Sequence, residues 1–336
     1  MTPPRFWRQD GVAARLLSPA SALLTSVTAR RMARPGWTAP VPVLCCGNAT
    51  VGGTGKTPVA LDLGSRLLAR GRTVAFLSRG FGGRGQGIRR AKNFDDAGDE
   101  PMLLDAVAPC WLGSDRAASA RAAIDHGADV LVMDDGLQNP TLHKTMSLLV
   151  VDAGAGFGNG RVLPAGPLRE PAAAAATRCR AIVLLGGGPI FGDNPIFGDN
   201  PIPALGLPVL RGDVRPRDGG LAGTRVLAFA GIGRPEKFFA TVAATGAVLV
   251  GARAFPDHHR YRAGDLDQLQ RDAAEHGATL VTTAKDAVRL PERRDRVTVL
   301  EGTVLEGTVL EFTVLEIDLA WHDPTQIEAL LDEVLA

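Results

Sequence analysis

The sequence predicts an α/β fold of the P-loop NTPase type, with a mostly parallel sheet flanked by helices and a second, smaller α/β domain. Short apolar segments alternate with helical ones from residue 41 onward, as expected for parallel strands joined by crossover helices. A glycine-rich loop ending in Lys56 and Thr57 follows the first apolar segment. With 336 residues, the chain is long enough for two domains.

The elements follow in order along the chain. In the first domain we expect strands at 41–46, 73–78, 129–134 and 147–152, and helices at 57–70 and 117–126. In the second we expect strands at 225–230, 247–250 and 279–282, and helices at 235–244 and 264–276. A closing helix at 324–335 could pack on either domain. The expected boundaries are an N-terminal region at 1–36, a core domain at 37–215, a smaller domain at 224–322 and a C-terminal helix at 323–336.

The first 36 residues contain six arginines and a single acid, Asp10. Apolar residues recur at helical spacing between Leu16 and Val27, which predicts an amphipathic helix. This helix could pack on its own domain, or it could lie at a membrane surface with its arginines on anionic headgroups. No run reaches 18 consecutive apolar residues, so a spanning helix is not expected. A signal peptide is disfavoured because a nucleotide-binding loop follows so closely.

Composition excludes other classes. The net charge of +1 argues against nucleic-acid binding through a global basic field. The four cysteines contain no C-x-x-C pair, which disfavours a disulfide framework or a zinc site and favours a reducing cytosol.

The loop from Gly47 to Pro58 carries the strongest chemical signal. Its cofactor-binding candidates are Thr50, Val51, Gly52, Gly53, Thr54, Gly55, Lys56 and Thr57. The glycines let backbone N–H groups converge on phosphate oxygens, the lysine contributes a positive charge, and the final threonine offers its hydroxyl to magnesium. The strict G-x-x-x-x-G-K-[ST] pattern has glycine where this chain has Thr50.

A second signal is the apolar strand ending in Asp134 and Asp135, with Gln138 close behind. Such a strand is how a P-loop enzyme holds magnesium, so both acids are metal candidates and Gln138 could position a phosphate or water. The alternative is a strand-terminating turn rich in Asp and Gly.

Three weaker signals remain open. Asp99 or Glu100 could accept the proton of a hydroxyl acceptor, or could simply complement a helix dipole. The polar cluster at 255–261 contains His258, which could assist a carboxylate or be a solvated loop residue. Arg79, Arg169 and the segment 282–286 each place a basic residue after a strand, where open α/β sheets bind ligands.

Taken together and in this order, the motifs resemble the tetraacyldisaccharide 4'-kinase family, which phosphorylates a lipid A precursor. The resemblance rests on the P-loop variant with Thr50 and on the segments SRGFG 78–82, GDEP 98–101, DDGLQ 134–138, PAGPLREP 164–171, AFAGIGRPEKFF 228–239, FPDHHRY 255–261 and TAKD 283–286. It extends from residue 5 to about 320.

The resemblance implies ATP and Mg²⁺ as cofactors and transfer of the γ-phosphate to the 4'-hydroxyl of a tetraacyldisaccharide 1-phosphate. It implies that Asp99 is the catalytic base, that His258 assists it, and that Arg79, Glu100 and Arg169 line the substrate cleft. It further implies a small domain that closes over the nucleotide, and peripheral attachment to the cytoplasmic face of the bacterial inner membrane through the N-terminal helix. Nucleic acid is not an expected partner.

The chain departs from the family pattern at a few places. Phe81 replaces a usual Tyr, and Ala284 replaces a usual Glu, so the contacts of those side chains are in doubt. Pro-Ile-Phe-Gly-Asp-Asn occurs twice within 189–200, and Thr-Val-Leu-Glu recurs four times within 298–316. We interpret these repeats as local duplications that lengthen a loop and a strand or hairpin.

Two other functions remain as alternatives. A P-loop GTPase or ATPase acting as a switch or metallochaperone would be favoured by a guanine-specific N-K-x-D motif, and no lysine here is followed two residues later by aspartate. A soluble small-metabolite kinase would carry the N-terminal helix only as a structural element.

Overall fold

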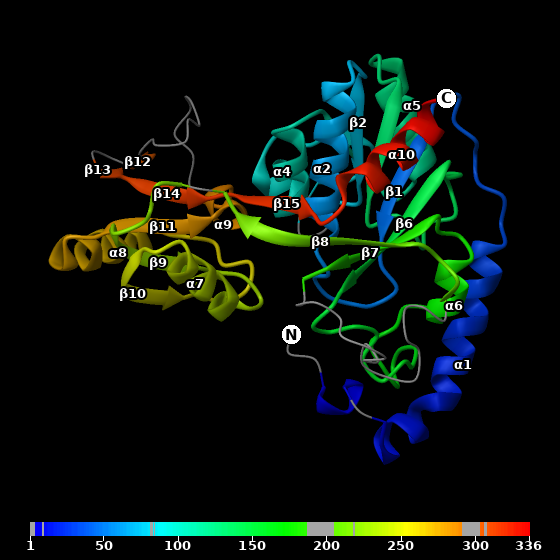
Figure 1. Cartoon of the computed structure of the whole chain (residues 1–336), viewed down its shortest axis with the longest axis horizontal. Coiled ribbons are helices and arrows are strands. Elements are labelled where there is room, and N and C mark those ends of the chain that lie inside the picture. The colour runs from blue at the N-terminus through cyan, green and yellow to red at the C-terminus, as the bar shows by residue number, and fades with distance from the viewer. Residues whose placement is uncertain are drawn as a thin grey trace. The chain divides into compact units, whose positions relative to one another are not determined.

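The computed structural model describes residues 4–8, 10–80, 83, 85–186, 205–217, 219–290, 303–305 and 308–336. The chain forms two compact units (Figure 1). The first comprises Met1–Val214 and Leu319–Ala336, and the second comprises Arg215–Asp318. The change from the first unit to the second falls inside the Gly/Pro/Arg-rich stretch 211–223, and the chain returns to the first unit before its closing helix.

The first unit is built on a nine-stranded sheet of order β15-β8-β7-β6-β1-β5-β2-β4-β3. Its strands are β1 (Val43–Gly47), β2 (Val74–Ser78), β3 (Arg89–Arg90), β4 (Cys110–Leu112), β5 (Val130–Asp134), β6 (Met146–Asp152), β7 (Ala181–Leu185), β8 (Val209–Pro216) and β15 (Ile317–Trp321). The strands from β8 to β4 pair in parallel, and β3 pairs antiparallel with β4. The central strands are fully buried, as expected for a sheet covered on both faces.

The helices of this unit are α1 (Val12–Met32), α2 (Lys56–Ala69), α3 (Phe94–Ala97), α4 (Asp99–Asp105), α5 (Arg116–Asp125), α6 (Ala172–Ala176) and α10 (Pro324–Leu335), after a short 3-10 turn at Arg5–Trp7. Two hydrophobic clusters lie on opposite faces of the sheet. One gathers side chains of α2, α4 and α10, and the other gathers those of α5 and α6. The closing helix therefore packs on the first unit, through Ile327 and Leu331.

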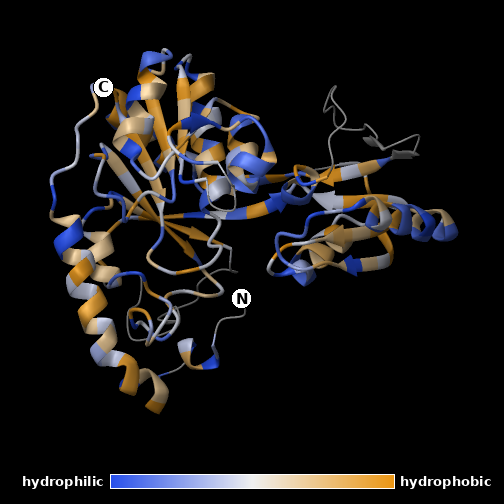
Figure 2. Cartoon of the chain, turned by 180° about the vertical axis from the view of Figure 1, so that it is seen from behind, coloured by the Kyte–Doolittle hydropathy of each residue, from blue (hydrophilic) through white to orange (hydrophobic). Residues whose placement is uncertain are grey.

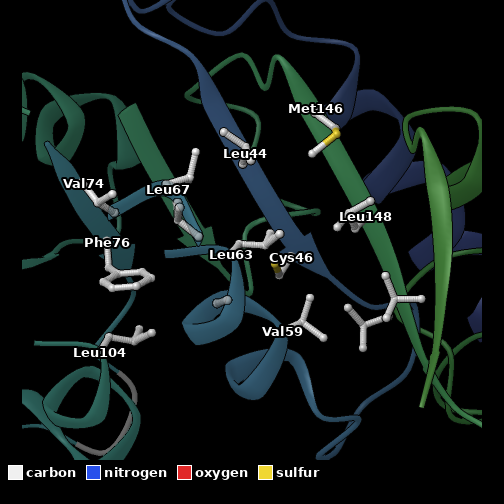
Figure 3. Close-up of a cluster of buried hydrophobic side chains, with 14 of the residues drawn as sticks. Leu44, Cys46, Val59, Leu63, Leu67, Val74, Phe76, Leu104, Met146 and Leu148 are labelled. Carbon is white, nitrogen blue, oxygen red and sulfur yellow. The ribbon is translucent and has the colours of Figure 1, made fainter. Parts of the chain in front are cut away.

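The packing of α2 on the sheet fixes the start of that helix. Val59 and Leu63 of α2 lie against Leu44 and Cys46 of β1 in the first cluster (Figure 3). The helix approaches β2 closely at Gly64, where a Cβ atom would lie 2.3 Å from the ring of Phe76. Only glycine permits that approach.

The second unit has a four-stranded sheet of order β10-β9-β11-β14, with β9 (Arg225–Ala230), β10 (Val248–Ala254), β11 (Thr279–Thr283) and β14 (Phe312–Leu315) all parallel. Its helices are α7 (Pro235–Ala244), α8 (Ala263–His276) and α9 (Ala284–Ala287). β12 (Thr303–Leu305) and β13 (Thr308–Leu310) pair antiparallel, so two Thr-Val-Leu-Glu copies form a hairpin-like pair. A third copy contributes to β14.

Most of the predicted elements occur within two residues of their expected bounds. Two elements differ more: β10 extends four residues beyond its expected end, and α1 extends beyond both ends of the apolar pattern at 16–27. The strands β3, β4, β7, β8 and β15 were not predicted. Phe81 and the duplication at 189–200 lie outside the described residues. Ala284 begins α9 directly after its N-cap, Thr283.

The helix α1 is longer than the apolar pattern predicts. By length and composition alone it could cross a membrane, although a spanning helix is not expected from the runs of apolar residues. Within it only Ala14 and Ser21 are buried, whereas Leu16 and Leu23 are 76% and 68% exposed. Orange apolar turns occur along this helix in Figure 2.

Candidate active site

The glycine-rich loop joins β1 to α2. Gly52 and Gly55 have φ values of 106° and 85°, in the left-handed region that favours glycine. A Cβ atom at Gly55 would also lie 2.4 Å from Leu185 Cδ1. The left-handed backbone therefore favours glycine at both positions, and at Gly55 a side chain would also displace Leu185.

Thr50 has a different role. It forms an isolated antiparallel bridge with Leu168, flanked by hydrogen bonds from Val51 N to Pro167 O (2.8 Å) and from Arg169 N to Ala49 O (2.7 Å). The segment 167–169 thus pairs with the start of the loop. Because the left-handed positions fall on Gly52 and Gly55, a side chain is tolerated at position 50.

Thr57 and Asp134 meet because β1 and β5 are parallel neighbours that end at the same edge of the sheet. The Thr57 hydroxyl donates to Asp134 Oδ2 at 3.1 Å. Asp134 Oδ1 is buried and has no hydrogen-bond partner among the residues that the structure describes. Burial, together with the nearby negative charge of Glu100, raises the pKa of Asp134 to about 7.

Asp135 has a different environment from its neighbour. Its φ of 52° turns the chain sharply after β5, and its Oδ1 lies 2.8 Å from Arg169 Nη1 and 3.7 Å from Lys56 Nζ. Burial acts to raise the pKa of Asp135, but Lys56 and Arg169 outweigh it and the pKa lies below its ordinary value. The pair therefore combines one readily protonated carboxyl with one that is held ionised.

Gln138 is held by a buried polar group. Its Nε2 donates to Asn48 O at 2.8 Å and to Glu170 Oε1 at 2.9 Å, and Glu170 also accepts from Arg178 at 2.6 Å. Glu170 is only 3% exposed. These contacts connect the start of the P-loop, the DDGLQ turn and the segment that carries Arg169.

Sequence reasoning missed three residues of this region: Asn48, Arg116 and Glu170. Arg116 is 2% exposed and donates to Gly113 O, and within the described part of the chain its Nε has no hydrogen-bond partner. Burial lowers the pKa of Arg116, against the opposing charge of Asp135. Arg116 could have been found from the sequence, because the polar turn Gly113–Arg116 follows an apolar segment, as the turns at Asp134 and Arg79 do. Glu170 directly follows a candidate residue and could have been found from that position.

The remaining candidates of the first unit lie at the start of α4 and directly after β2. Asp99 opens α4 behind Gly98, which has a φ of 84°, and it is 4% exposed. Glu100 lies close enough to Asp134 to raise its pKa. Arg79 follows β2 and is exposed.

His258 belongs to the second unit, in the loop after β10. Its φ is 58°, its backbone N–H donates to Gly231 O at 2.9 Å, and its side chain is 52% exposed. The neighbouring His259 is engaged structurally, since it stacks on Phe255 and its Nε2 lies 3.0 Å from Asp265 Oδ2. Of the two adjacent histidines, only His258 presents its ring mainly to solvent.

The residues around Thr57 suit a magnesium ion that is shared with phosphate groups. Within the described ranges, no group of three or more His, Cys, Asp or Glu side chains could hold a metal. Mg²⁺ usually takes one or two protein ligands and completes its shell with water and phosphate oxygens. The Thr57 hydroxyl and the unpartnered Asp134 Oδ1 fit that donor set.

Comparison with known proteins places these features in context. Residues 13–336 match the model of the family described as tetraacyldisaccharide-1-P 4'-kinase. The curated tetraacyldisaccharide 4'-kinase of Gluconacetobacter diazotrophicus is 52% identical, covering 99% of this chain and 98% of that protein. The protein of the same name from Rhodospirillum centenum is 47% identical, covering 100% of this chain and 97% of that protein.

One solved structure is similar over almost the whole chain. It is LpxK from Aquifex aeolicus, crystallised in complex with ATP, with a TM-score of 0.73 and 23% sequence identity. The match covers 96% of this chain and 99% of that chain, and it shows a common fold.

Proposed function

The chain belongs to the tetraacyldisaccharide-1-P 4'-kinase family and is a kinase of lipid A biosynthesis, and we propose that it binds ATP in the P-loop for this reaction. The acceptor is the 4'-hydroxyl of a tetraacyldisaccharide 1-phosphate. The observation that carries the proposed nucleotide site is the contact between Thr57 and Asp134 at the end of a glycine-rich loop.

The P-loop would bind the triphosphate through its backbone and Lys56. The left-handed Gly52 and Gly55 let N–H groups turn toward phosphate oxygens, and Lys56 adds a positive charge. Without nucleotide, Lys56 and Arg169 both form ion pairs with the carboxylate of Asp135. The side chain of Gln138, held by Glu170, is the candidate for positioning a phosphate.

Thr57 and Asp134 would hold Mg²⁺. A bound magnesium ion would neutralise charge on the phosphate oxygens. Asp134 must be ionised to serve as a ligand, and its raised pKa means that it readily carries a proton in the absence of the metal. Asp135, held ionised by its two cations, would stay anionic throughout.

Asp99 is the proposed general base. A sugar hydroxyl must lose its proton as its oxygen attacks phosphorus, and a carboxylate is the usual acceptor in kinases. Asp99 is buried at the first turn of α4. We assign His258 the role of assisting that base, and Arg79, Glu100 and Arg169 the role of lining the substrate site.

The helix α1 is proposed to attach the enzyme peripherally to the cytoplasmic face of the inner membrane. Its side toward the protein is small and polar: the Ser21 hydroxyl donates to Val162 O at 2.7 Å and accepts from Ala165 N at 3.2 Å. Arg161 holds the beginning of the helix through Asp10 and Ser18. Its large apolar side chains point away from the protein, as in a helix whose apolar face enters the acyl boundary.

The direct test is incubation of the purified chain with γ-labelled ATP, magnesium and a tetraacyldisaccharide 1-phosphate in detergent micelles. We expect label on the 4' position, and competition by excess unlabelled ATP rather than GTP. A preference for GTP with no labelled lipid would favour the switch or metallochaperone function instead. Transfer to a soluble sugar at an equal rate, unchanged on deletion of residues 1–30, would favour a small-metabolite kinase.

A further inference from the structure

The second unit contains a fully buried carboxylate, Asp286, at the end of the sheet where the His258 loop lies. Asp286 Oδ1 accepts from Gly231 N and from the Tyr261 hydroxyl, both at 2.8 Å, and Oδ2 accepts from the Thr283 hydroxyl at 2.6 Å. Arg289 Nη1 lies 3.1 Å from Oδ1. A carboxylate that is 0% exposed is costly unless its lone pairs are satisfied, and here both oxygens accept hydrogen bonds.

The backbone of Gly231 connects this carboxylate to His258. Its N–H donates to Asp286, while its carbonyl accepts from His258 N at 2.9 Å and from Arg289 Nη1 at 2.6 Å. A Cβ atom at Gly231 would lie 3.0 Å from His259 Cβ and 3.2 Å from Asp286 Oδ1, so the segments are in close contact. Asp286 therefore holds the Gly231 backbone, to which the backbone N–H of His258 is hydrogen-bonded.

Tyr261 fixes the same loop on the other side of His258. It is 5% exposed, and its ring packs edge-on against Phe229 and Phe255. Burial and the adjacent carboxylate of Asp286 raise the pKa of Tyr261, so its hydroxyl remains a donor to Asp286. Asp286 thus holds the His258 loop at two points: through Gly231, whose carbonyl accepts from His258 N, and through the hydroxyl of Tyr261.

The backbone at His258 requires such support. A φ of 58° is uncommon for a residue other than glycine, and it persists where the surrounding contacts overdetermine it. We propose that Asp286 is a positioning residue, which holds His258 in the conformation needed for phosphoryl transfer. This inference rests on the proposed function, in which His258 assists the reaction.

The test is a double-mutant cycle. Asp286→Asn keeps the shape of the side chain but removes its charge and one acceptor, and it is made both in the native chain and in His258→Ala. We expect kcat to fall about tenfold or more in the native background, within the range of a lost acid–base contribution. In the His258→Ala background we expect a change of less than about twofold, with KM for ATP unchanged in both. An equal fold loss in both backgrounds would overturn the proposal.

A matched control is Asp272→Asn, which removes a carboxylate charge from the same unit. Asp272 lies on α8, where its carboxylate pairs with Arg253 of β10 and accepts a hydrogen bond from Gln268 Nε2 at 2.6 Å. We expect its kcat to equal that of the native chain. If Asp286→Asn does not fold, Tyr261→Phe, which removes a single hydrogen bond to Asp286, takes its place in the same cycle.

Histidine NMR separates this inference from the kinase assignment. In Asp286→Asn, or Tyr261→Phe, we expect the ring signals of His258 to shift while those of His276 and His322 stay in place. Unchanged His258 signals would contradict the positioning role whether or not the chain phosphorylates a lipid. A shift without any lipid phosphorylation by the native chain would support the positioning of His258 and remove only the proposed function.

Discussion

The Thr57 hydroxyl and Asp134 Oδ2 lie 3.1 Å apart, which joins the first turn of α2 to the end of β5. The P-loop that leads into α2 follows β1, and β1 and β5 are parallel neighbours, so both groups lie at the same edge of the sheet. The contact prepares a donor set for a metal, and the first prediction follows from it.

Thr57→Val should disable the metal-dependent reaction while leaving the fold intact, because valine has the shape of threonine but no hydroxyl. We expect kcat/KM for MgATP to fall at least about 10²-fold, the range seen when one group that stabilises a transition-state charge is removed. Initial rates over a magnesium titration measure this. Thr57→Ser is the control, since it keeps the hydroxyl and should retain most of the activity.

Substitutions of Lys56 and Asp99 should affect ATP binding and turnover differently. Lys56→Ala removes a positive charge from the phosphate site, so we expect weaker ATP binding as well as slower turnover. Asp99→Ala removes the proposed base, so we expect kcat to fall about 10²–10⁴-fold with the Kd for ATP nearly unchanged. Equilibrium ATP binding together with steady-state kinetics separates the two effects.

Asp95→Ala serves as the control for Asp99, because Asp95 is an exposed acid on the preceding helix, α3. Its rate and ATP affinity should equal those of the native chain. An equal loss of ATP binding in Lys56→Ala and Asp99→Ala would refute the division of roles.

The exposed apolar side chains of α1 should govern membrane attachment. Replacing Leu16 and Leu23 by Glu places charge where both side chains are largely exposed, so we expect the thermal unfolding temperature to change little. Binding to vesicles containing anionic lipids should fall sharply, because buried apolar area drives interfacial binding. Vesicle sedimentation measures this, with Val248→Glu, an exposed apolar residue of β10, as the control.

Two helical glycines should respond in opposite directions to alanine. Gly64→Ala forces a methyl group against the Phe76 ring, so we expect a loss of about 1–3 kcal/mol in the free energy of unfolding. Gly264 in α8 has no atom within 4 Å of its would-be Cβ, so Gly264→Ala should add up to about 1 kcal/mol through helix propensity. Denaturant unfolding of both variants checks this. Similar changes at the two sites would contradict the close α2–β2 approach.

The sequence predicted the parts of the candidate site that consist of residues adjacent in the chain. The P-loop, the DDGLQ turn and the helix opened by Asp99 are local patterns, and the fold brings the first two together because parallel strands end at one edge. The family resemblance, and the matches that bear it out, added the acceptor, which no single motif specifies.

Other features could not be predicted because they depend on contacts between residues far apart in the chain. The Asp286 carboxylate joins Gly231 and Tyr261, and nothing in the short segment 282–286 indicates those partners. Arg116 reads as an ordinary surface arginine until the fold buries it. The return of the chain in β15 lacked a distinctive alternation, because the preceding Thr-Val-Leu-Glu repeats obscured it.

That return has a consequence for how the protein is made. His322 N donates to Arg211 O and Arg217 N donates to Glu316 O, so β8 and β15 are antiparallel neighbours although most of the second unit lies between them in the sequence. During synthesis the ribosome therefore completes the second unit before it releases the last strand and helix of the first. Until α10 is released, the apolar surface of the first unit that Ile327 and Leu331 cover stays exposed. A chaperone that binds exposed apolar surface would act on the chain at this stage.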